Sequence, residues 1–199
     1  MSNKKTKTQK RPLVLCILDG WGIYKDYNGN AITKAATPNY DRFWQDYPHT
    51  QLKAHGKYVG LPNKEDGNSE AGHLNLGAGR IIKQENLIVN EAVADGTFLK
   101  NPAFLSSAKH VKENKSQVHL MGLLSGWQSA HSDPQHIVAL LKFYRQQGVD
   151  KIFLHLFTDG RDSFQYGAKD FLLKLKKDLK PNEKIATISG RFYAIKKKN

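Results

Sequence analysis

The second half of the chain alternates between two hydrophobic patterns, and this alternation restricts the possible folds more than any other feature. Three short apolar runs, at 117–124, 151–157 and 184–189, have the length and composition of strands. The segments between them, 133–148 and 166–180, carry apolar residues at intervals of three and four, the period of an amphipathic helix. This order predicts a parallel sheet with helical crossovers, and therefore a three-layer α/β fold.

The first half is less regular. The run at 13–18 in "RPLVLCILDGWG" is continuously apolar, which predicts a strand buried on both faces with Asp19 at its end. Residues 38–47 begin with proline and have aromatic residues at helical spacing, which predicts a helix. Glycines recur over 57–80 and predict a loop. We expect three parts, namely a flexible basic tail at 1–11, a first domain segment at 12–85 and a second at 86–199.

The positive charge of the chain is concentrated at its ends. Lys and Arg number 31 against 18 Asp and Glu, and the formal net charge is +13. Eight of the basic residues lie in the first 11 residues and at 196–198, which contain no acid, so the body has an excess of only five. No basic stripe interleaved with aromatic residues is left, which argues against a nucleic-acid-binding protein. A small anionic substrate suits the remaining charge.

The chain has a single cysteine, Cys16, which excludes an internal disulfide and a thiolate metal cluster and fits a reducing cytoplasm. The apolar run at 13–18 is too short for a signal peptide or a membrane span. We therefore expect a soluble protein with no membrane partner.

Polar residues follow each predicted strand of the second half, and ligands of open α/β sheets bind at such strand ends. The candidates are His131, Arg161, Asp162 and Arg191. Two arginines in one crevice indicate recognition of phosphate or carboxylate, because a guanidinium pairs with such groups through two hydrogen bonds. The alternative is that each arginine pairs with a neighbouring acid.

Two further residues each have two interpretations. Ser69 in "DGNSEAGH" is either a helix N-cap, with Glu70 in the first turn, or a nucleophile, although no G-x-S-x-G motif surrounds it. Asp19 precedes a glycine and is either a turn residue or a metal ligand, and no histidine pair at ligand spacing lies near it. Local patterns leave both questions open.

Several longer strings resemble a known family. They are "LCILDGWGI", "NAITKAATPNYDRF", "LKAHGKYVGLPNKEDGNSEAGHLNLGAGRIIKQ", "HLMGLLS", "FTDGRDS" and "ISGRFYA". Together they resemble cofactor-independent phosphoglycerate mutases of the alkaline phosphatase superfamily. The resemblance runs from about residue 12 to residue 194.

The resemblance implies an enzyme that interconverts 3-phosphoglycerate and 2-phosphoglycerate in glycolysis, with two Mn²⁺ or Mg²⁺ ions and without 2,3-bisphosphoglycerate. Residues 12–85 would be a segment of the phosphatase-like metal-binding domain, and 86–199 the opening half of an inserted α/β transferase domain. Members of the family are usually monomeric and cytoplasmic. The implied roles are nucleophile and metal ligand for Ser69, metal ligand for Asp19, substrate contact for His131, Arg161, Asp162 and Arg191, and proton acceptor for Asp162.

The sequence departs from the family pattern in three places. Ala71 replaces a valine of the serine block. The loop 125–133 reads "SGWQSAHSD" where the family has "SDGGVHSH", so His131 aligns only with a one-residue insertion. Most of the family's metal ligands would follow the last residues, "IKKKN", in which Lys197 replaces an arginine.

We therefore expect this chain to be a truncated or frameshifted mutase that cannot catalyse alone, because Asp19 and Ser69 leave most metal-coordination positions unfilled. A related metal-dependent phosphohydrolase is one alternative. A non-catalytic remnant that serves as a binding module is another.

Overall fold

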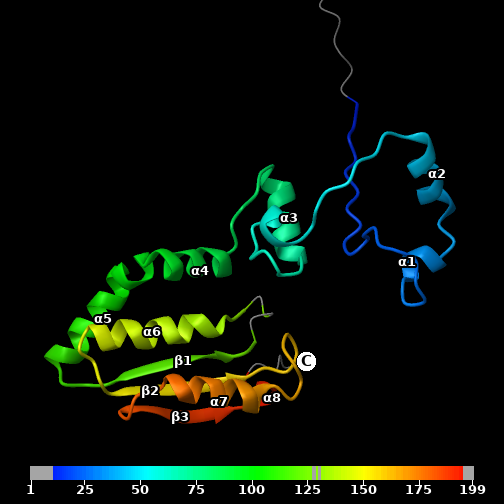
Figure 1. The fold of residues 1–199 in the computed structure, drawn as a ribbon. Coiled ribbons are helices and arrows are strands. Elements are labelled where there is room, and N and C mark those ends of the chain that lie inside the picture. The colour runs from blue at the N-terminus through cyan, green and yellow to red at the C-terminus, as the bar shows by residue number, and fades with distance from the viewer. Residues whose placement is uncertain (1–10, 127–128, 130, 195–199) are drawn as a thin grey trace, which may run out of the picture. The chain divides into compact units, whose positions relative to one another are not determined.

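The computed structural model of the chain describes residues 11–126, 129 and 131–194. The closing lysines, Lys197 among them, and the predicted basic tail apart from Arg11 lie outside these residues. The chain forms two compact units, Met1–Leu52 and Lys53–Asn199, which we describe separately (Figure 1). The predicted boundary near residue 85 concerns larger domains and stays a prediction.

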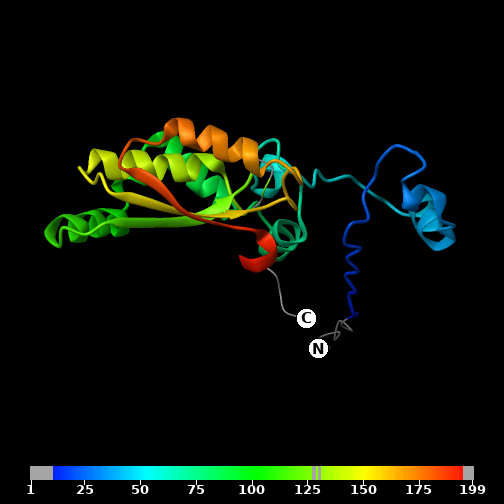
Figure 2. The ribbon, with the colours of Figure 1, turned by 90° about the horizontal axis from the view of Figure 1, so that it is seen from below.

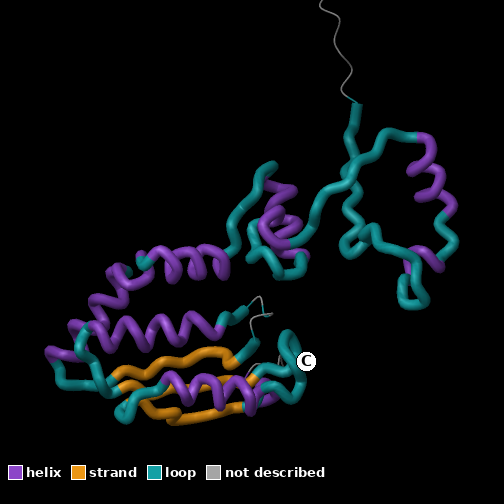
Figure 3. Tube along the Cα trace, in the orientation of Figure 1, coloured by secondary structure: helices purple, strands orange, loops and turns teal. Residues whose placement is uncertain are grey.

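The predicted strand at 13–18 is wrong, because these residues form an extended loop in the first unit (Figure 3). Leu13 is 93% exposed and Val14 85%. A strand that is apolar on both faces needs neighbouring strands and covering helices. No described residue of this unit supplies such a neighbour, so the hydrophobic run has nothing to pack against.

The remainder of the first unit contains two short helices, α1 (Ala31–Lys34) and α2 (Pro38–Asp46). The predicted helix at 38–47 is confirmed, with Pro38 in the first turn, where its missing N–H costs no hydrogen bond. Aromatic rings hold the unit together, since Tyr40 lies 5.3 Å from Trp21 and 6.0 Å from Trp44 between ring centroids.

The second unit begins with helical turns and a glycine-rich loop. Its elements before the sheet are η1 (Gly56–Val59), α3 (Ser69–Ala78), α4 (Glu85–Asp95), η2 (Thr97–Lys100) and α5 (Pro102–Glu113). The expected loop at 57–80 therefore contains a helix, α3. Asn75 fixes this helix to the loop, because its side chain donates to Val59 O at 2.9 Å and accepts from Ile82 N at 2.6 Å.

The sheet has three parallel strands in the order β1-β2-β3, as the alternating pattern predicted. Its elements are β1 (Val118–Leu124), α6 (Pro134–Gln146), β2 (Ile152–Thr158), α7 (Ala168–Asp178), β3 (Glu183–Ser189) and α8 (Arg191–Ala194). The α/β class is confirmed. Figure 2 shows α6 and α7 on the same side of the strands.

The hydrophobic core lies between the sheet and these two helices. Leu154 and Leu156 of β2 and Leu141 and Phe143 of α6 are fully buried, and Leu175 of α7 packs with them. Alternate strand residues point to the other face, where Met121 is largely exposed. The core thus fixes the strands firmly while their ends stay accessible. None of the described helices is long and apolar enough to span a membrane.

Candidate functional site

The three strands end at one edge of the sheet, and the residues that follow them meet there. Ser125 follows β1, Asp159 follows β2, and Arg191 begins α8 directly after Gly190, the residue that follows β3. Parallel strands present their carboxyl ends at a common edge, the usual place for a ligand site in open α/β sheets. The structure therefore brings residues of the three strand ends together, and their role as a ligand site stays a prediction.

Asp159 is the centre of this neighbourhood. Its Oδ2 accepts from Ser125 Oγ at 2.7 Å, and its Oδ1 accepts from Arg191 Nη1 at 3.0 Å. The backbone amides of Arg161 and Asp162 also donate to Oδ1, at 3.2 and 3.4 Å. The carboxylate side chain is 1% exposed and the Arg191 side chain 25%. One buried carboxylate therefore links the ends of all three strands.

The environment keeps Asp159 ionised. Burial alone would raise the pKa of its carboxyl, but hydrogen bonds from Ser125, from the amides of Arg161 and Asp162 and from Ser163 outweigh burial and lower the pKa. The charge of Arg191 is therefore balanced by the carboxylate beside it.

The turn after β2 depends on Gly160. Its φ is +103°, a conformation that residues with a side chain rarely adopt. An added Cβ would also lie 3.2 Å from the backbone oxygen of Gln165. This turn brings the amides of Arg161 and Asp162 back towards Asp159, so the "DGRD" sequence folds around its own first carboxylate.

Arg161 and Asp162 differ from Arg191 in their environment. The Arg161 side chain is exposed and makes no hydrogen bond or ion pair within the described part of the chain. Asp162 Oδ2 is buried, and no hydrogen-bond donor reaches it from the described residues. Buried carboxylate oxygens normally have a partner, so a ligand hydroxyl suits this atom. The alternative that an arginine pairs with a neighbouring acid holds for Arg191 and not for Arg161.

His131 lies on the altered loop between β1 and α6, of which residues 127, 128 and 130 are not among the described ones. Its amide donates to Ser129 Oγ at 3.2 Å, and Ser132 Oγ donates to Leu123 O at 2.7 Å. These bonds fix the backbone on either side of the exposed imidazole. Among the described residues, no hydrogen bond joins this ring to Arg161, Asp162 or Arg191.

Ser69 is the first residue of α3 and is exposed. The N-cap of this helix is Asn68, whose side chain accepts from Ala71 N at 2.8 Å. The interpretation of Ser69 as the cap is therefore wrong. Behind it, Ala71 is fully buried against Val59 and Leu61. Ser69 thus occupies a fixed helix start without being the residue that caps it.

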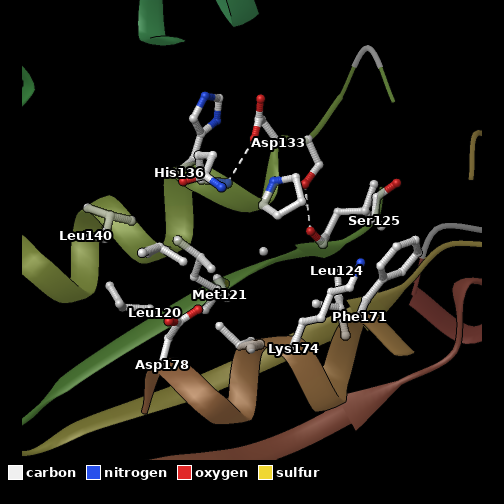
Figure 4. A pocket seen from close by; sticks show the side chains of 18 of the residues that line it. Leu120, Met121, Leu124, Ser125, Asp133, His136, Leu140, Phe171, Lys174 and Asp178 are labelled. Carbon is white, nitrogen blue, oxygen red and sulfur yellow. Dashed lines mark hydrogen bonds between the residues drawn. The ribbon is translucent and has the colours of Figure 1, made fainter. Parts of the chain in front are cut away.

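A pocket of the second unit lies between β1, α6 and α7 and includes Ser125 and His131 in its lining (Figure 4). Its volume is about 620 Å³. Leu120 and Leu124 are among its apolar lining residues, and Asp133, Lys174 and Asp178 are its charged ones. Two carboxylates against one ammonium do not suit an anionic ligand. The better candidate for an anion site is the arginine cluster at the strand ends.

Sequence reasoning missed Asp159 and Ser125. Asp159 precedes a glycine at a strand end, and an Asp-Gly pair in a sequence suggests first a simple turn. What distinguishes Asp159 is that two backbone amides, a serine and an arginine all donate to its carboxylate. Ser125 and Arg191 are 34 and 32 residues away from it in sequence. Local patterns do not carry such a pairing.

Comparison with known proteins identifies the family of the chain. Residues 89–199 match the family model for the N-terminus of BPG-independent phosphoglycerate mutase. The chain belongs to this family. The matched range contains the whole sheet and the cluster of Asp159, Arg161, Asp162 and Arg191, together with His131.

Full-length relatives in the family are much longer than this chain. The 2,3-bisphosphoglycerate-independent phosphoglycerate mutase of Clostridium perfringens is 46% identical over 192 residues, which are 96% of this chain and 37% of that protein. The corresponding mutase 1 of Methanosarcina barkeri is 48% identical over 94% of this chain and 36% of its own length. The chain thus spans little more than a third of the curated relatives it matches.

A solved structure has the same fold. Crystal structures of Leishmania mexicana phosphoglycerate mutase at low cobalt concentration include a chain with a TM-score of 0.68 to this one. The sequences are 30% identical, and the match covers 80% of this chain and 30% of the other. The α/β architecture of the second unit is therefore that of phosphoglycerate mutases.

The described residues do not fit the two-metal centre that the family resemblance implies. They contain no group of three or more His, Cys, Asp or Glu side chains able to hold an ion. The two metal ligands that the resemblance implies, Asp19 and Ser69, supply one carboxylate and one hydroxyl. Hard divalent ions need several oxygen ligands. These two residues supply too few.

Proposed function

We propose that this chain provides the substrate-binding part of a cofactor-independent phosphoglycerate mutase, an isomerase of glycolysis that interconverts 3-phosphoglycerate and 2-phosphoglycerate without 2,3-bisphosphoglycerate. The observation that carries the proposal is the cluster at the strand ends, where Asp159 joins Arg161, Asp162 and Arg191 within the range that matches the family. The single cysteine supports a cytoplasmic location for it.

The chemistry of this cluster suits a phosphorylated acid. Arg161 is exposed and offers a planar fork of donors to a phosphate or carboxylate. Arg191 uses one nitrogen on Asp159, and a guanidinium has five N–H donors, so several stay available to a ligand. His131 is exposed on the neighbouring loop and adds a donor for phosphoryl or glycerate oxygens. Phosphoglycerate carries both kinds of anionic group.

In the proposed reaction, Ser69 accepts the phosphoryl group. The Ser69 oxygen forms a bond to phosphorus as the bond from phosphorus to the glycerate oxygen breaks, and the proton of the Ser69 hydroxyl passes to that glycerate oxygen, so the glycerate leaves as an alcohol. After the glycerate turns, its other hydroxyl attacks the phosphoserine and the bond from phosphorus to the Ser69 oxygen breaks. Asp162 accepts the proton of the attacking hydroxyl, and this proton returns to the Ser69 oxygen. The buried Oδ2 of Asp162, without a donor among the described residues, supports this role.

The described residues lack the ligands for the two Mn²⁺ or Mg²⁺ ions of the family, so we expect no mutase turnover by the 199-residue chain alone. An assay with 3-phosphoglycerate, excess enolase and added Mn²⁺ tests this expectation, with an active family member as the positive control. Turnover above the enolase blank would contradict it. The observed turnover would then have to arise without the two-metal site of the family.

Substrate binding is tested separately from turnover. We expect 3-phosphoglycerate to bind the chain in calorimetry, and Arg161→Ala to weaken binding by at least about tenfold, because a two-point guanidinium–anion contact is lost. Arg42→Ala is the matched control, since Arg42 is an exposed arginine of the first unit. Equal losses in both variants, or no binding by the unaltered chain, would overturn the proposed substrate.

A non-catalytic binding module is the second candidate. The buried core of the second unit favours it, because a continuous core supports independent folding. A cooperative thermal melt together with phosphoglycerate binding and no turnover supports this candidate. Release of phosphate from phosphomonoesters would instead favour the phosphohydrolase alternative.

A further inference from the structure

Asp159 lies at the end of the central strand and accepts hydrogen bonds from both neighbouring strand ends. Ser125 Oγ reaches Oδ2 at 2.7 Å from the end of β1, and Arg191 Nη1 reaches Oδ1 at 3.0 Å from the start of α8. With a side chain only 1% exposed, Asp159 has little direct access to a ligand in solvent. Its contacts are all with groups that would surround such a ligand.

We propose that Asp159 is a positioning residue of the phosphoglycerate site, which holds the Arg191 guanidinium and the turn carrying Arg161 and Asp162 in the arrangement that binds the anion. This inference rests on the proposed function. It assigns to Asp159 a role that acts through Arg191 and the turn, and no direct contact with substrate.

The need for such a residue follows from the properties of arginine. A free arginine side chain loses rotamer entropy when it is fixed. Arg191 is already fixed by the buried carboxylate while a quarter of its side chain stays exposed. A ligand that meets an ordered guanidinium avoids that cost on binding, which is the usual benefit of a preorganised site.

The same carboxylate also orders the turn. Arg161 and Asp162 each donate their backbone amide to Oδ1, so the two residues that follow Gly160 are fixed relative to Arg191. Ser125 and Ser163 complete the set of donors. Loss of the carboxylate would release an arginine from one side of the site and the turn from the other.

The opposite role for Asp159 would be to neutralise Arg191 and weaken anion binding. Two substitutions separate the roles. Asp159→Asn removes the charge but keeps an acceptor for Arg191 and the two amides, whereas Asp159→Ala removes the acceptor as well. Positioning predicts that asparagine rescues binding, and neutralisation predicts that both variants bind the anion more tightly.

The experiment measures 3-phosphoglycerate affinity of the 199-residue chain by calorimetry, with folding checked by circular dichroism. We expect Asp159→Ala to raise Kd by about tenfold or more and Asp159→Asn by no more than about threefold, as for loss or retention of charge-assisted hydrogen bonds. Asp150→Asn, at an exposed aspartate, is the control. Unchanged affinity in Asp159→Ala, or tighter binding in Asp159→Asn, overturns the proposal.

A second measurement separates this proposal from the proposed function. Nitrogen-15 NMR of the guanidinium reports whether Arg191 is held, with or without a ligand. We expect restricted, resolved Arg191 side-chain signals in the unaltered chain and in Asp159→Asn, and averaged signals in Asp159→Ala. If the unaltered chain binds no phosphoglycerate, the proposed function fails. Averaged Arg191 signals in that chain would overturn the positioning role itself.

Discussion

Arg145 and Glu183 form a two-point ion pair that joins α6 to the start of β3. Arg145 Nε donates to Oε1 and Nη2 to Oε2, both at 2.6 Å, and the glutamate side chain is 2% exposed. Glu183 also accepts from Lys180 N at 2.8 Å. The pair fixes the last strand of the sheet, and the position of β3 in turn determines where Arg191, the first residue of α8, lies.

Removal of Glu183 is therefore expected to destabilise the second unit. Glu183→Ala leaves Arg145 partly buried without its anion, and we expect a loss of about 2–4 kcal/mol in the free energy of unfolding. Urea denaturation followed by circular dichroism measures it. The control is Glu113→Ala, which breaks the exposed Lys109–Glu113 pair at 3.7 Å and should cost about 0.5 kcal/mol or less. Similar losses in both variants would contradict a special role for the buried pair.

The pH dependence of stability follows from the same residue. Burial would raise the pKa of the Glu183 carboxyl, but hydrogen bonds from Arg145 and Lys180 outweigh burial and lower the pKa. The unfolded chain therefore takes up the proton first as the pH falls. The stabilising contribution is complete above the ordinary glutamate pKa of about 4.3 and is lost below it. The pKa of the Asp159 carboxyl is also lowered, so its contribution to stability is lost in acid as well.

We expect the melting temperature to fall between pH 5 and pH 3, and the fall to be smaller in Glu183→Gln. Glu65 provides a contrast, because burial raises the pKa of its carboxyl. Its neutral form is favoured by folding, so Glu65→Gln should steepen the acid dependence. Thermal melts at several pH values test both variants. Parallel pH profiles for the two variants would contradict these assignments.

The parts of the fold that could be predicted are those set by local pattern. The three strands and two helices of the sheet follow from hydrophobic periodicity, and the structure confirms them to within about two residues at each end. The run at 13–18 has the same local pattern as a buried strand and forms none. The local pattern shows that a segment would be stable as a buried strand. It does not show whether neighbouring strands and helices are present to bury it.

In the candidate site, too, some features follow from local pattern and others depend on residues far apart in sequence. His131, Arg161, Asp162 and Arg191 were predicted because they follow strands, and three of the four meet around Asp159. The ion pair of Arg191 with Asp159 joins residues 32 apart, and no local rule selects that partner over other acids. Ser69 was predicted to be either a helix cap or a nucleophile, because serine is a good capping residue in sequence, and the observed cap, Asn68, was not considered.

The assignment of the cap to Asn68 gives a direct test. Asn68→Ala removes the acceptor for Ala71 N, and we expect a loss of about 1 kcal/mol of stability for α3. Ser69→Ala should cost clearly less, since the helix start does not depend on its side chain as the cap. Hydrogen exchange of the Ala71 amide compares the two variants. A larger effect of Ser69→Ala would return the capping role to the serine.

The loop that precedes Ser69 depends on the close approach of Gly67 to the backbone of Ala54. A Cβ at Gly67 would lie 1.7 Å from Ala54 O, a distance that forces the backbone to move. Gly72, within α3, has no atom within 4 Å of its added Cβ and lacks the positive φ that would strain an alanine. The two glycines therefore make a matched pair for the same substitution.

We expect Gly67→Ala to destabilise the loop by about 1–3 kcal/mol, the usual cost of forced overpacking, and to displace the start of α3. Gly72→Ala should instead stabilise the helix by about 0.5–1 kcal/mol, because alanine loses less conformational entropy than glycine in a helix. Hydrogen exchange across residues 54–71 and thermal melts measure both effects. Because the steric conflict is with a backbone oxygen and not with a flexible side chain, a neutral Gly67→Ala would mean that the loop does not hold Ser69 as described.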